Sequence, residues 1–335
     1  MPHRGSTTLP ASYHSTRARQ RRNEACLAYL LLAPSAILLL AFGFWPVLNA
    51  GWLSLREWHT APGGFVGLSN YRQAFTAEPA FWRSLQVTVW YVLGTVPATL
   101  ILGYGLAELL LARIRGLAFY RTLFFLPYVV SPVAAAAVWK WIYNPSFGLA
   151  NAVGARVGIH SRWLYEDGGV FRLAADSVHF PLPHWADGPS LALVCIIGVT
   201  VWQSLGFAVV ILLAGLAAIP AEVTDAARLD GARGWALIWN VRLPLVSPTL
   251  FFLLIVFTIR AFQSFTQIYI LSPDGRGGPN DTTRNITLYI VQCFNENAAR
   301  LGPGYGAAIA MVLFAMILVL TLIQFRVLGR QVHYQ

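Results

Sequence analysis

The chain has 335 residues, of which 56% are hydrophobic and only 11% charged, less than half the charged content of about 25% in ordinary soluble domains. This composition excludes a water-soluble globular protein. The formal net charge of +10 does not predict a nucleic-acid partner, because the basic residues gather in short segments between apolar runs.

Six apolar runs are long enough to cross a hydrocarbon core about 30 Å thick, which takes roughly 20 residues in a helix. They lack the two-residue alternation of barrel strands, and the bilayer offers no water to open backbone groups, so helices are expected. The expected spans are approximately residues 28–48, 85–111, 120–142, 191–216, 249–271 and 305–327. The predicted fold is therefore all-α, a polytopic membrane protein with six transmembrane helices.

Charge asymmetry predicts the orientation of these spans. With the amino terminus inside, the cytoplasmic segments hold thirteen arginines against five acids, whereas the outer loops hold nine of each. This positive-inside pattern places both termini in the cytoplasm. Residues 1–25 are polar and arginine-rich, which predicts a disordered basic cytoplasmic tail ahead of a transmembrane domain over residues 26–335.

The loops and prolines carry fewer signals. The run from Phe65 to Tyr71 in the first outer loop has the amphipathic character of a segment at the membrane surface. Pro127 and Pro132 are expected to kink the third span. The second outer loop, residues 144–189, contains three histidines without helical ligand spacing, so no metal site is predicted. These histidines are His160, His179 and His184.

The loop between the fourth and fifth spans, about residues 219–246, predicts a helix lying along the cytoplasmic membrane face. Pro220 suits its first turn, and acids near its start complement the positive end of the helix dipole. Gly231 predicts its end, and residues 235–241 predict a second short helix that stops before Pro244. Ala226 and Ala227 give it a small-residue surface that another protein can approach closely.

This loop resembles the coupling loop of binding-protein-dependent ABC transporter permeases, whose pattern is Glu-Ala-Ala, three residues, Gly, nine residues, Ile-x-Leu-Pro. Here it stands as Asp225-Ala226-Ala227, then Gly231, then Val241-Arg242-Leu243-Pro244, with every interval kept. Aspartate replaces the usual glutamate and valine the isoleucine. Other segments similar to the carbohydrate branch of this family are Phe65 to Tyr71, Phe119 to Leu123 with Leu126-Pro127, Trp141 to Pro145 with Gly148-Leu149, Gly277 to Pro279, Tyr305 to Ala308, Gln324 to Arg326 and Val332 to Gln335.

The resemblance implies a non-catalytic permease subunit in the bacterial cytoplasmic (inner) membrane. ATP and Mg would be bound by two partner ATPase subunits, and this chain has no phosphate-binding loop motif of its own. The other implied partners are a second permease subunit, an extracytoplasmic solute-binding protein and a carbohydrate-like solute such as a sugar, a polyol or glycerol-3-phosphate. The implied ATPase-coupling residues are Asp225, Ala226, Ala227, Asp230, Gly231, Leu243 and Pro244.

Polar side chains inside the spans are candidates for the translocation pathway, because such groups usually face a bundle interior. Gln263 and Gln267 are four residues apart and predict one helical face, although hydrogen bonding between helices is an equal interpretation. Arg260 could attract a phosphate-bearing solute, with a structural ion pair or snorkelling as alternatives. The full set is Gln203, Ser204, Arg260, Gln263, Ser264 and Gln267.

Two other classes of function compete with the importer. A secondary transporter driven by an ion gradient would need an acid buried in a span, and the only acid near one is Glu108. A membrane-embedded enzyme would need a convergent catalytic cluster, and none is visible in the sequence.

Overall fold

The computed structural model describes residues 11–58, 62–111, 116–158, 160–177, 183, 187–295 and 301–327. The chain divides into two units, Met1–Leu53 and Ser54–Gln335. In the first unit α1 (Ala11–Leu39) leads through a π turn, η1 (Leu40–Phe44), into α2 (Trp45–Ser54). Residues 11–25 are therefore helical where a disordered tail was expected. This segment has no glycine or proline and is rich in arginine and alanine, which favour helix.

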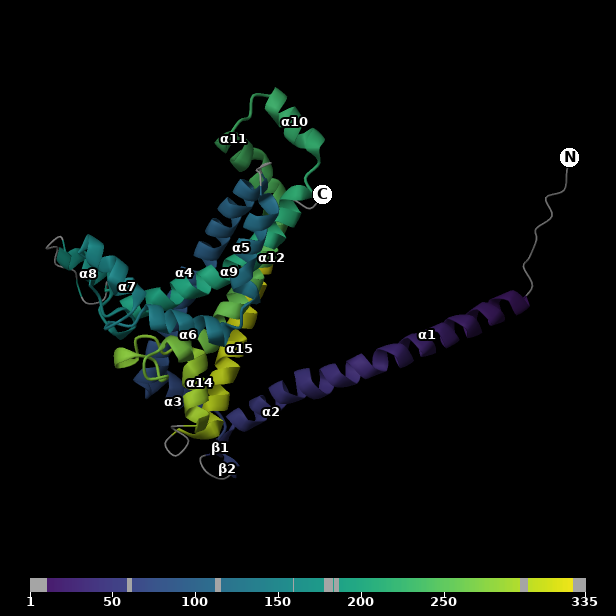
Figure 1. Cartoon of the computed structure of the whole chain (residues 1–335). Coiled ribbons are helices and arrows are strands. Elements are labelled where there is room, and N and C mark those ends of the chain that lie inside the picture. Colours follow the sequence, from purple (N-terminus) through teal and green to yellow (C-terminus); the bar gives the residue numbers. More distant parts are fainter. Residues whose placement is uncertain are drawn as a thin grey trace. The chain divides into compact units, whose positions relative to one another are not determined.

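The second unit is a bundle of helices with short elements in its loops (Figure 1). Its first half contains β1 (Arg56–Trp58), β2 (Pro62–Phe65), α3 (Ser69–Thr76), α4 (Pro79–Leu111), α5 (Leu117–Val129), α6 (Pro132–Ile142), α7 (Leu149–Gly154), η2 (Ala155–Val157), η3 (Trp163–Tyr165), α8 (Val170–Ser177) and α9 (Leu191–Ala217). Its second half contains α10 (Ala221–Leu229), α11 (Trp235–Leu237), η5 (Ile238–Arg242), α12 (Leu243–Phe262), α13 (Thr266–Leu271), η6 (Pro279–Asp281), α14 (Ile286–Asn295) and α15 (Gly302–Val327).

Five described helices are long and apolar enough to cross a membrane, and a sixth span is counted if α5 and α6 are taken together. This confirms the predicted polytopic helical fold. α5 and α6 are bent by 96° at the break between Val129 and Pro132. Pro132 occupies the first turn of α6, where its missing N–H costs nothing, so the predicted kink is confirmed as a full break.

Helices α4 and α9 pack along each other through small residues. A Cβ added at Gly94 would lie 2.7 Å from Ile197 Cδ1, and one added at Gly103 would lie 2.8 Å from Ala208 Cβ. Glycines at these points let the two backbones approach closely, which is how membrane helices gain van der Waals contact. The core around them includes Tyr91 and Leu212, both fully buried.

The fifth span differs from its prediction at both ends. A continuous helix runs from Trp235 to Phe262, so Pro244 does not break the chain as expected. A π turn ends just before this proline, with the Leu243 N–H bonded to the Ile238 carbonyl, and the wider turn accommodates the ring. At the other end the helix stops at Phe262 and α13 begins only at Thr266.

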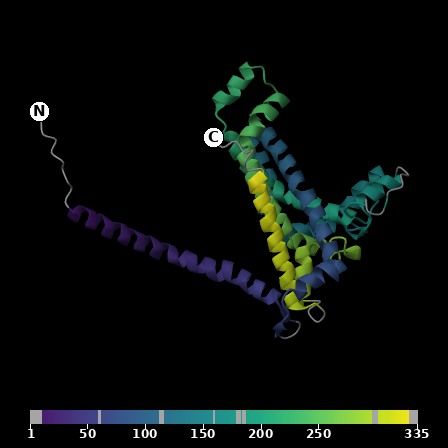
Figure 2. The ribbon, with the colours of Figure 1, turned by 180° about the vertical axis from the view of Figure 1, so that it is seen from behind.

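The loops at the two ends of this bundle are unlike each other. At one end, α10 and α11 form the connection between α9 and α12 (Figure 1), and the view from behind shows the same arrangement (Figure 2). At the opposite end lie α3, α14 and an antiparallel hairpin of β1 and β2, in which Arg56 pairs with Phe65. The hairpin is a small exception to the all-α fold.

Candidate functional site

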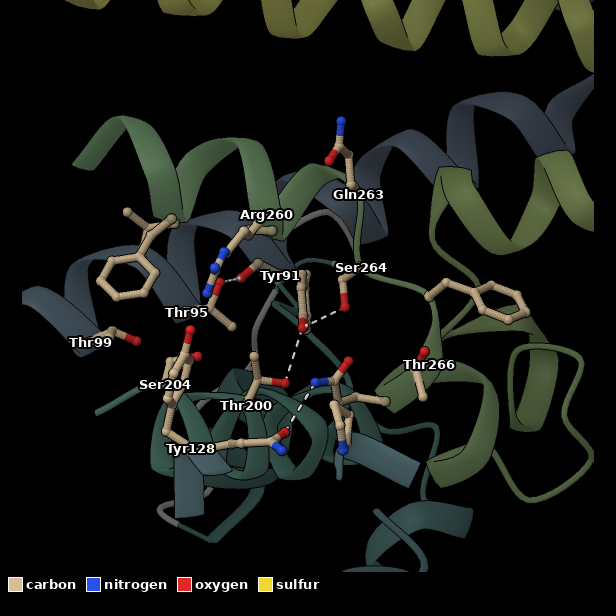
Figure 3. A pocket seen from close by; sticks show the side chains of 17 residues that line it. Tyr91, Thr95, Thr99, Tyr128, Thr200, Ser204, Arg260, Gln263, Ser264 and Thr266 are labelled. Carbon is tan, nitrogen blue, oxygen red and sulfur yellow. Dashed lines mark hydrogen bonds between the residues drawn. The ribbon is translucent and has the colours of Figure 1, made fainter. Parts of the chain in front are cut away.

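A cavity of about 370 Å³ lies inside the second unit, within the range of small-molecule sites. It is bordered by α4, α9, α12 and α13, and by the break between α5 and α6 (Figure 3). All six predicted pathway residues line it. The side chains that surround it are Tyr91, Thr95, Val96, Thr99, Tyr128, Pro132, Thr200, Gln203, Ser204, Phe257, Arg260, Ala261, Gln263, Ser264, Phe265, Thr266 and Gln267.

A hydroxyl network joins three walls of this cavity. The Tyr91 hydroxyl on α4 lies 3.0 Å from Thr200 Oγ1 on α9 and 2.9 Å from Ser264 Oγ beyond the end of α12 (Figure 3). The Ser264 carbonyl in turn accepts a hydrogen bond of 2.6 Å from Asn285 Nδ2. These bonds hold the irregular backbone between α12 and α13 in place, as irregular backbone at membrane depth requires.

Two glutamines join α9 to the helix breaks on either side of it. Gln203 Nε2 donates to the Val130 carbonyl at 3.2 Å, and Gln267 Nε2 donates to Gln203 Oε1 at 3.1 Å. Val130 lies in the break between α5 and α6, where its backbone is extended and the regular pattern of helical hydrogen bonds is interrupted. Both amides therefore take part in contacts between α9 and its neighbours while they line the cavity.

Arg260 is the only charged side chain among the described residues that line the cavity. Its guanidinium lies over the Phe207 ring, 5.1 Å from the centroid, a cation–π arrangement. Phe207 itself stacks on Tyr128 at 5.3 Å and meets Phe257 edge-on at 6.0 Å. The aromatic cluster thus holds a cation at the cavity wall without neutralising it.

The prediction of a shared face for Gln263 and Gln267 is wrong. Gln263 follows the last residue of α12, whereas Gln267 lies in α13, because the helix is interrupted between them. Gln263 is exposed and points away from the group of Tyr91, Thr200 and Ser264 (Figure 3).

The prediction also missed one whole wall of the cavity. Tyr91, Thr95 and Thr99 recur every four residues in an otherwise apolar helix, which places them on one face. That spacing was the pattern from which a polar face of α4 could have been predicted. No such pattern marks the aromatic residues Tyr128 and Phe257 as part of the cavity.

The loop between α9 and α12 forms the predicted helix, α10, with Pro220 before its first residue. Its end is a Schellman motif: Gly231 has φ +88°, its N–H bonds to the Arg228 carbonyl at 3.1 Å, and the Ala232 N–H bonds to the Ala227 carbonyl at 2.9 Å. The predicted helix end at Gly231 is confirmed, with Asp230 as the cap residue.

No residue of α10 is buried within this chain. Leu229 is 90% exposed and Trp235, at the start of α11, is 73% exposed. Within the part of the chain that the structure describes, Asp225 pairs with Arg228 of its own helix at 3.1 Å, an exposed i,i+3 contact. Leu243 and Pro244 lie in the first turn of α12. The coupling residues implied by the sequence therefore lie along one loop, with the alanines and Asp225 on its helix.

Among the residues that the structure describes, no group of three or more His, Cys, Asp or Glu side chains is placed to hold a metal ion. His179 and His184 of the second outer loop lie outside the described residues. Residues 332–335, which resemble the carbohydrate branch of the family, lie outside them as well.

Spanning helices around a polar internal cavity, with an exposed helix at one end, are the features of a membrane transport subunit. The family described as binding-protein-dependent transport system inner membrane component matches residues 27–332. The chain belongs to this family and is a multi-pass permease subunit of the inner membrane.

Curated relatives agree over nearly the whole length. The chain is 34% identical to the probable ABC transporter permease protein YesP of Bacillus subtilis, covering 95% of this chain and 96% of the relative. It is 33% identical to the sn-glycerol-3-phosphate transport system permease protein UgpA of Agrobacterium fabrum, covering 92% and 96%. It is 32% identical to the trehalose/maltose transport system permease protein MalF of Thermococcus litoralis, again covering 92% and 96%.

A solved structure shares the fold. A chain of a bacterial ABC transporter involved in the import of the acidic polysaccharide alginate superposes with a TM-score of 0.75. The match covers 94% of this chain and 99% of the other, at 20% sequence identity. This chain therefore shares the fold of that transporter chain.

Proposed function

We propose that this permease subunit imports a solute with energy from ATP hydrolysed by partner subunits, and that α10 is the surface on which one ATPase docks. The observation that carries this proposal is that α10 lies at one end of the bundle with none of its residues buried within this chain. An exposed Leu229 and Trp235 beside it supply the apolar surface that marks an interaction site. Positive charge in the flanking segments supports a cytoplasmic position for this end, where ATP is available.

The helix after α10 gives docking a mechanical consequence. From Trp235 to Phe262 the chain is one continuous helix, and the cavity residues Phe257 and Arg260 lie near its far end. Closure of an ATPase pair beneath α10 would therefore move the cavity wall directly. Asp225 is the polar anchor in this proposal, and Ala226 and Ala227 give the close contact. The exposed Asp225–Arg228 pair contributes little stability and is readily exchanged for a pairing with the ATPase.

The cavity supports a carbohydrate-like solute that carries a negative charge. Hydroxyl and amide groups from Tyr91, Thr200 and Gln203 suit a polyol, and Arg260 supplies a cation with no acid among the described lining residues. The names of relatives include both sn-glycerol-3-phosphate and trehalose/maltose transport systems. The lone Arg260 favours the first kind, a small phosphorylated polyol, because guanidinium binds phosphate through charge-assisted hydrogen bonds.

The complete transporter in this proposal contains a second permease subunit, two ATPase subunits that bind ATP and Mg, and an extracytoplasmic solute-binding protein. A crystal structure of the alginate transporter in complex with an oligosaccharide-bound periplasmic protein has the same fold, at a TM-score of 0.72, and supports the last of these partners. The solute-binding protein would deliver its bound solute at the end of the bundle opposite α10.

The test is uptake by the complete transporter in proteoliposomes. Uptake is expected to require ATP, to stop when the partner ATPase is inactivated, and to continue when ion gradients are collapsed. Asp225→Ala is expected to abolish most uptake in fully assembled complexes, whereas Asp225→Glu restores the family's usual residue and retains it. Uptake that follows an ion gradient without ATP would overturn the proposal in favour of secondary transport.

A further inference from the structure

Arg242 and Glu108 form an ion pair where the α10 loop rejoins the bundle. Arg242 is the last residue of the π turn η5, and its Nη1 donates to Glu108 Oε2 at 2.6 Å. The Tyr104 hydroxyl donates to the other carboxylate oxygen, Oε1, at 2.8 Å. Both oxygens of Glu108 are thus occupied, one by a residue of the loop and one by its own helix, α4.

The pair is shielded from water. The Glu108 side chain is 9% exposed and the Arg242 side chain 18%, in contrast to 66% and 55% for Asp225 and Arg228. Burial makes a pair costly to separate, because removing one partner leaves the other charge without compensation in an apolar setting. A buried pair of this kind is suited to fixing one arrangement of two elements.

The pair joins two helices that both line the solute cavity. α4 contributes Tyr91, Thr95 and Thr99, and α12, which begins directly after Arg242, contributes Phe257 and Arg260. Thr99 lies nine residues from Glu108, about 14 Å along the helix axis. A displacement of the loop at Arg242 would therefore reach two walls of the cavity through these two continuous helices.

Space beside the pair leaves room for the loop to move. A cavity of about 470 Å³ lies between α10 and the ends of α4 and α9, with Leu111, Leu216, Thr224 and Arg242 in its wall. α10 lies on one side of this space. Arg242 lies in the wall of the same space, and its ion pair with Glu108 connects the loop to α4. The loop is thus attached to α4 at a defined point, and α10 borders the space beside that point.

We propose that the Glu108–Arg242 pair, supported by Tyr104, is the pivot that transfers motion of α10 to α4, so that α4 and α12 move together when ATP is hydrolysed. The three residues act by positioning the helices and do not contact solute. This inference rests on the proposed docking of an ATPase at α10. It predicts that breaking the pair uncouples hydrolysis from transport while the ATPase stays bound.

The test measures solute transported per ATP hydrolysed by the complete transporter in proteoliposomes. Glu108→Gln and Arg242→Gln are expected to lower this ratio at least tenfold, with subunit assembly and basal ATP hydrolysis retained. The reversed pair, Glu108→Arg with Arg242→Glu, is expected to recover a substantial part of it. Tyr104→Phe removes one hydrogen bond without leaving a charge unpaired, so it should lower the transport ratio by a smaller factor. This variant still tests the proposal if the charge variants fail to assemble.

Arg172→Gln is the matched control, because it removes an arginine from another ion pair, with Asp187 at 3.1 Å, away from the α10 loop. Its transport ratio is expected to equal that of the wild type. A wild-type ratio in Glu108→Gln, or in Tyr104→Phe if the charge variants do not assemble, would overturn the pivot.

A cysteine cross-link between α10 and the ATPase separates this inference from the proposed function. If the cross-link forms and the ratio is unchanged in the variants, only the pivot is wrong. If the cross-link does not form in the wild type, the docking proposal itself fails, and the pivot fails with it.

Discussion

The side-chain amide of Gln203 donates a hydrogen bond to the backbone carbonyl of Val130, at the point where α5 ends and the chain turns through 96° into α6. The same side chain accepts from Gln267 at the break between α12 and α13. One residue in the middle of α9 therefore supports both interrupted spans, and both interruptions border the cavity. Irregular backbone at this depth depends on such side chains, because lipid supplies no hydrogen-bonding partner.

Replacing Gln203 with methionine, which is similar in length and cannot hydrogen-bond in its place, should destabilise the subunit. Leaving the Val130 carbonyl and the Gln267 amide without partners is expected to cost about 1–3 kcal/mol. Thermal unfolding in detergent measures the effect. Gln263→Met is the control, since Gln263 is exposed and points away from the hydroxyl network (Figure 3). Equal melting temperatures for the two variants would contradict the assigned role of Gln203.

Gly206 is expected to tolerate no side chain, because α5 crosses α9 at this residue. A Cβ there would lie 2.8 Å from the Phe124 carbonyl oxygen and 2.9 Å from Phe125 Cα, both backbone atoms. Gly206→Ala should therefore separate the two helices and cost about 1–3 kcal/mol. Gly105→Ala on α4 has no atom within 4 Å of the new methyl group and should leave thermal stability unchanged or slightly raised. A Gly206→Ala variant as stable as the wild type would contradict the close crossing of α5 and α9.

Gly231 is expected to be required for its backbone conformation alone. Its φ of +88° is strained for other residues, yet no atom lies within 4 Å of the position that a Cβ would occupy. Gly231→Val should distort the end of α10 at a cost of about 1–2 kcal/mol and lower uptake, whereas Gly231→Asn, which adopts this conformation more readily, should retain most of it. Uptake rates of assembled transporters give the comparison. Equal loss in both variants would point instead to a steric requirement.

Arg260 is expected to decide between charged and neutral solutes. Arg260→Gln should reduce uptake of sn-glycerol 3-phosphate about tenfold or more, since a charge-assisted hydrogen bond contributes about 1.5–3 kcal/mol, and change uptake of glycerol, maltose or trehalose much less. Arg260→Lys should retain part of the phosphate preference. An equal effect of Arg260→Gln on phosphorylated and neutral solutes would remove the proposed role and leave Arg260 as a structural partner of Phe207.

Much of the fold follows from the sequence because spanning a bilayer leaves few choices. Apolar runs of sufficient length predicted the helices, and Pro132 predicted the break in the third span. Pro244 misled for a definite reason: a π turn over Ile238–Arg242 precedes it, and this wider turn lets the helix continue past the proline ring. The sequence carries no signal for that wider turn.

The candidate site was partly predictable, because polar groups inside a membrane span usually face the interior of the helix bundle. Polar residues inside apolar runs pointed to six cavity residues, including Gln203 and Arg260. The Glu108–Arg242 contact could not be predicted from the sequence, because it joins positions 134 residues apart. Each charged residue alone is typical of a position at a membrane surface. The break after Phe262 was hidden as well, since no glycine or proline marks it.

Docking of an ATPase at α10 is the central claim, and a site-specific cross-link measures the contact between the two directly. Ala227→Cys on the assembled transporter, paired with single cysteines placed along the ATPase surface, should give a strong cross-link at one defined region that changes in yield when ATP binds. Phe171→Cys on α8, at an exposed position in the connection between α6 and α9, should give none. Absence of any cross-link from Ala227 in transporters that hydrolyse ATP and take up solute would contradict the account.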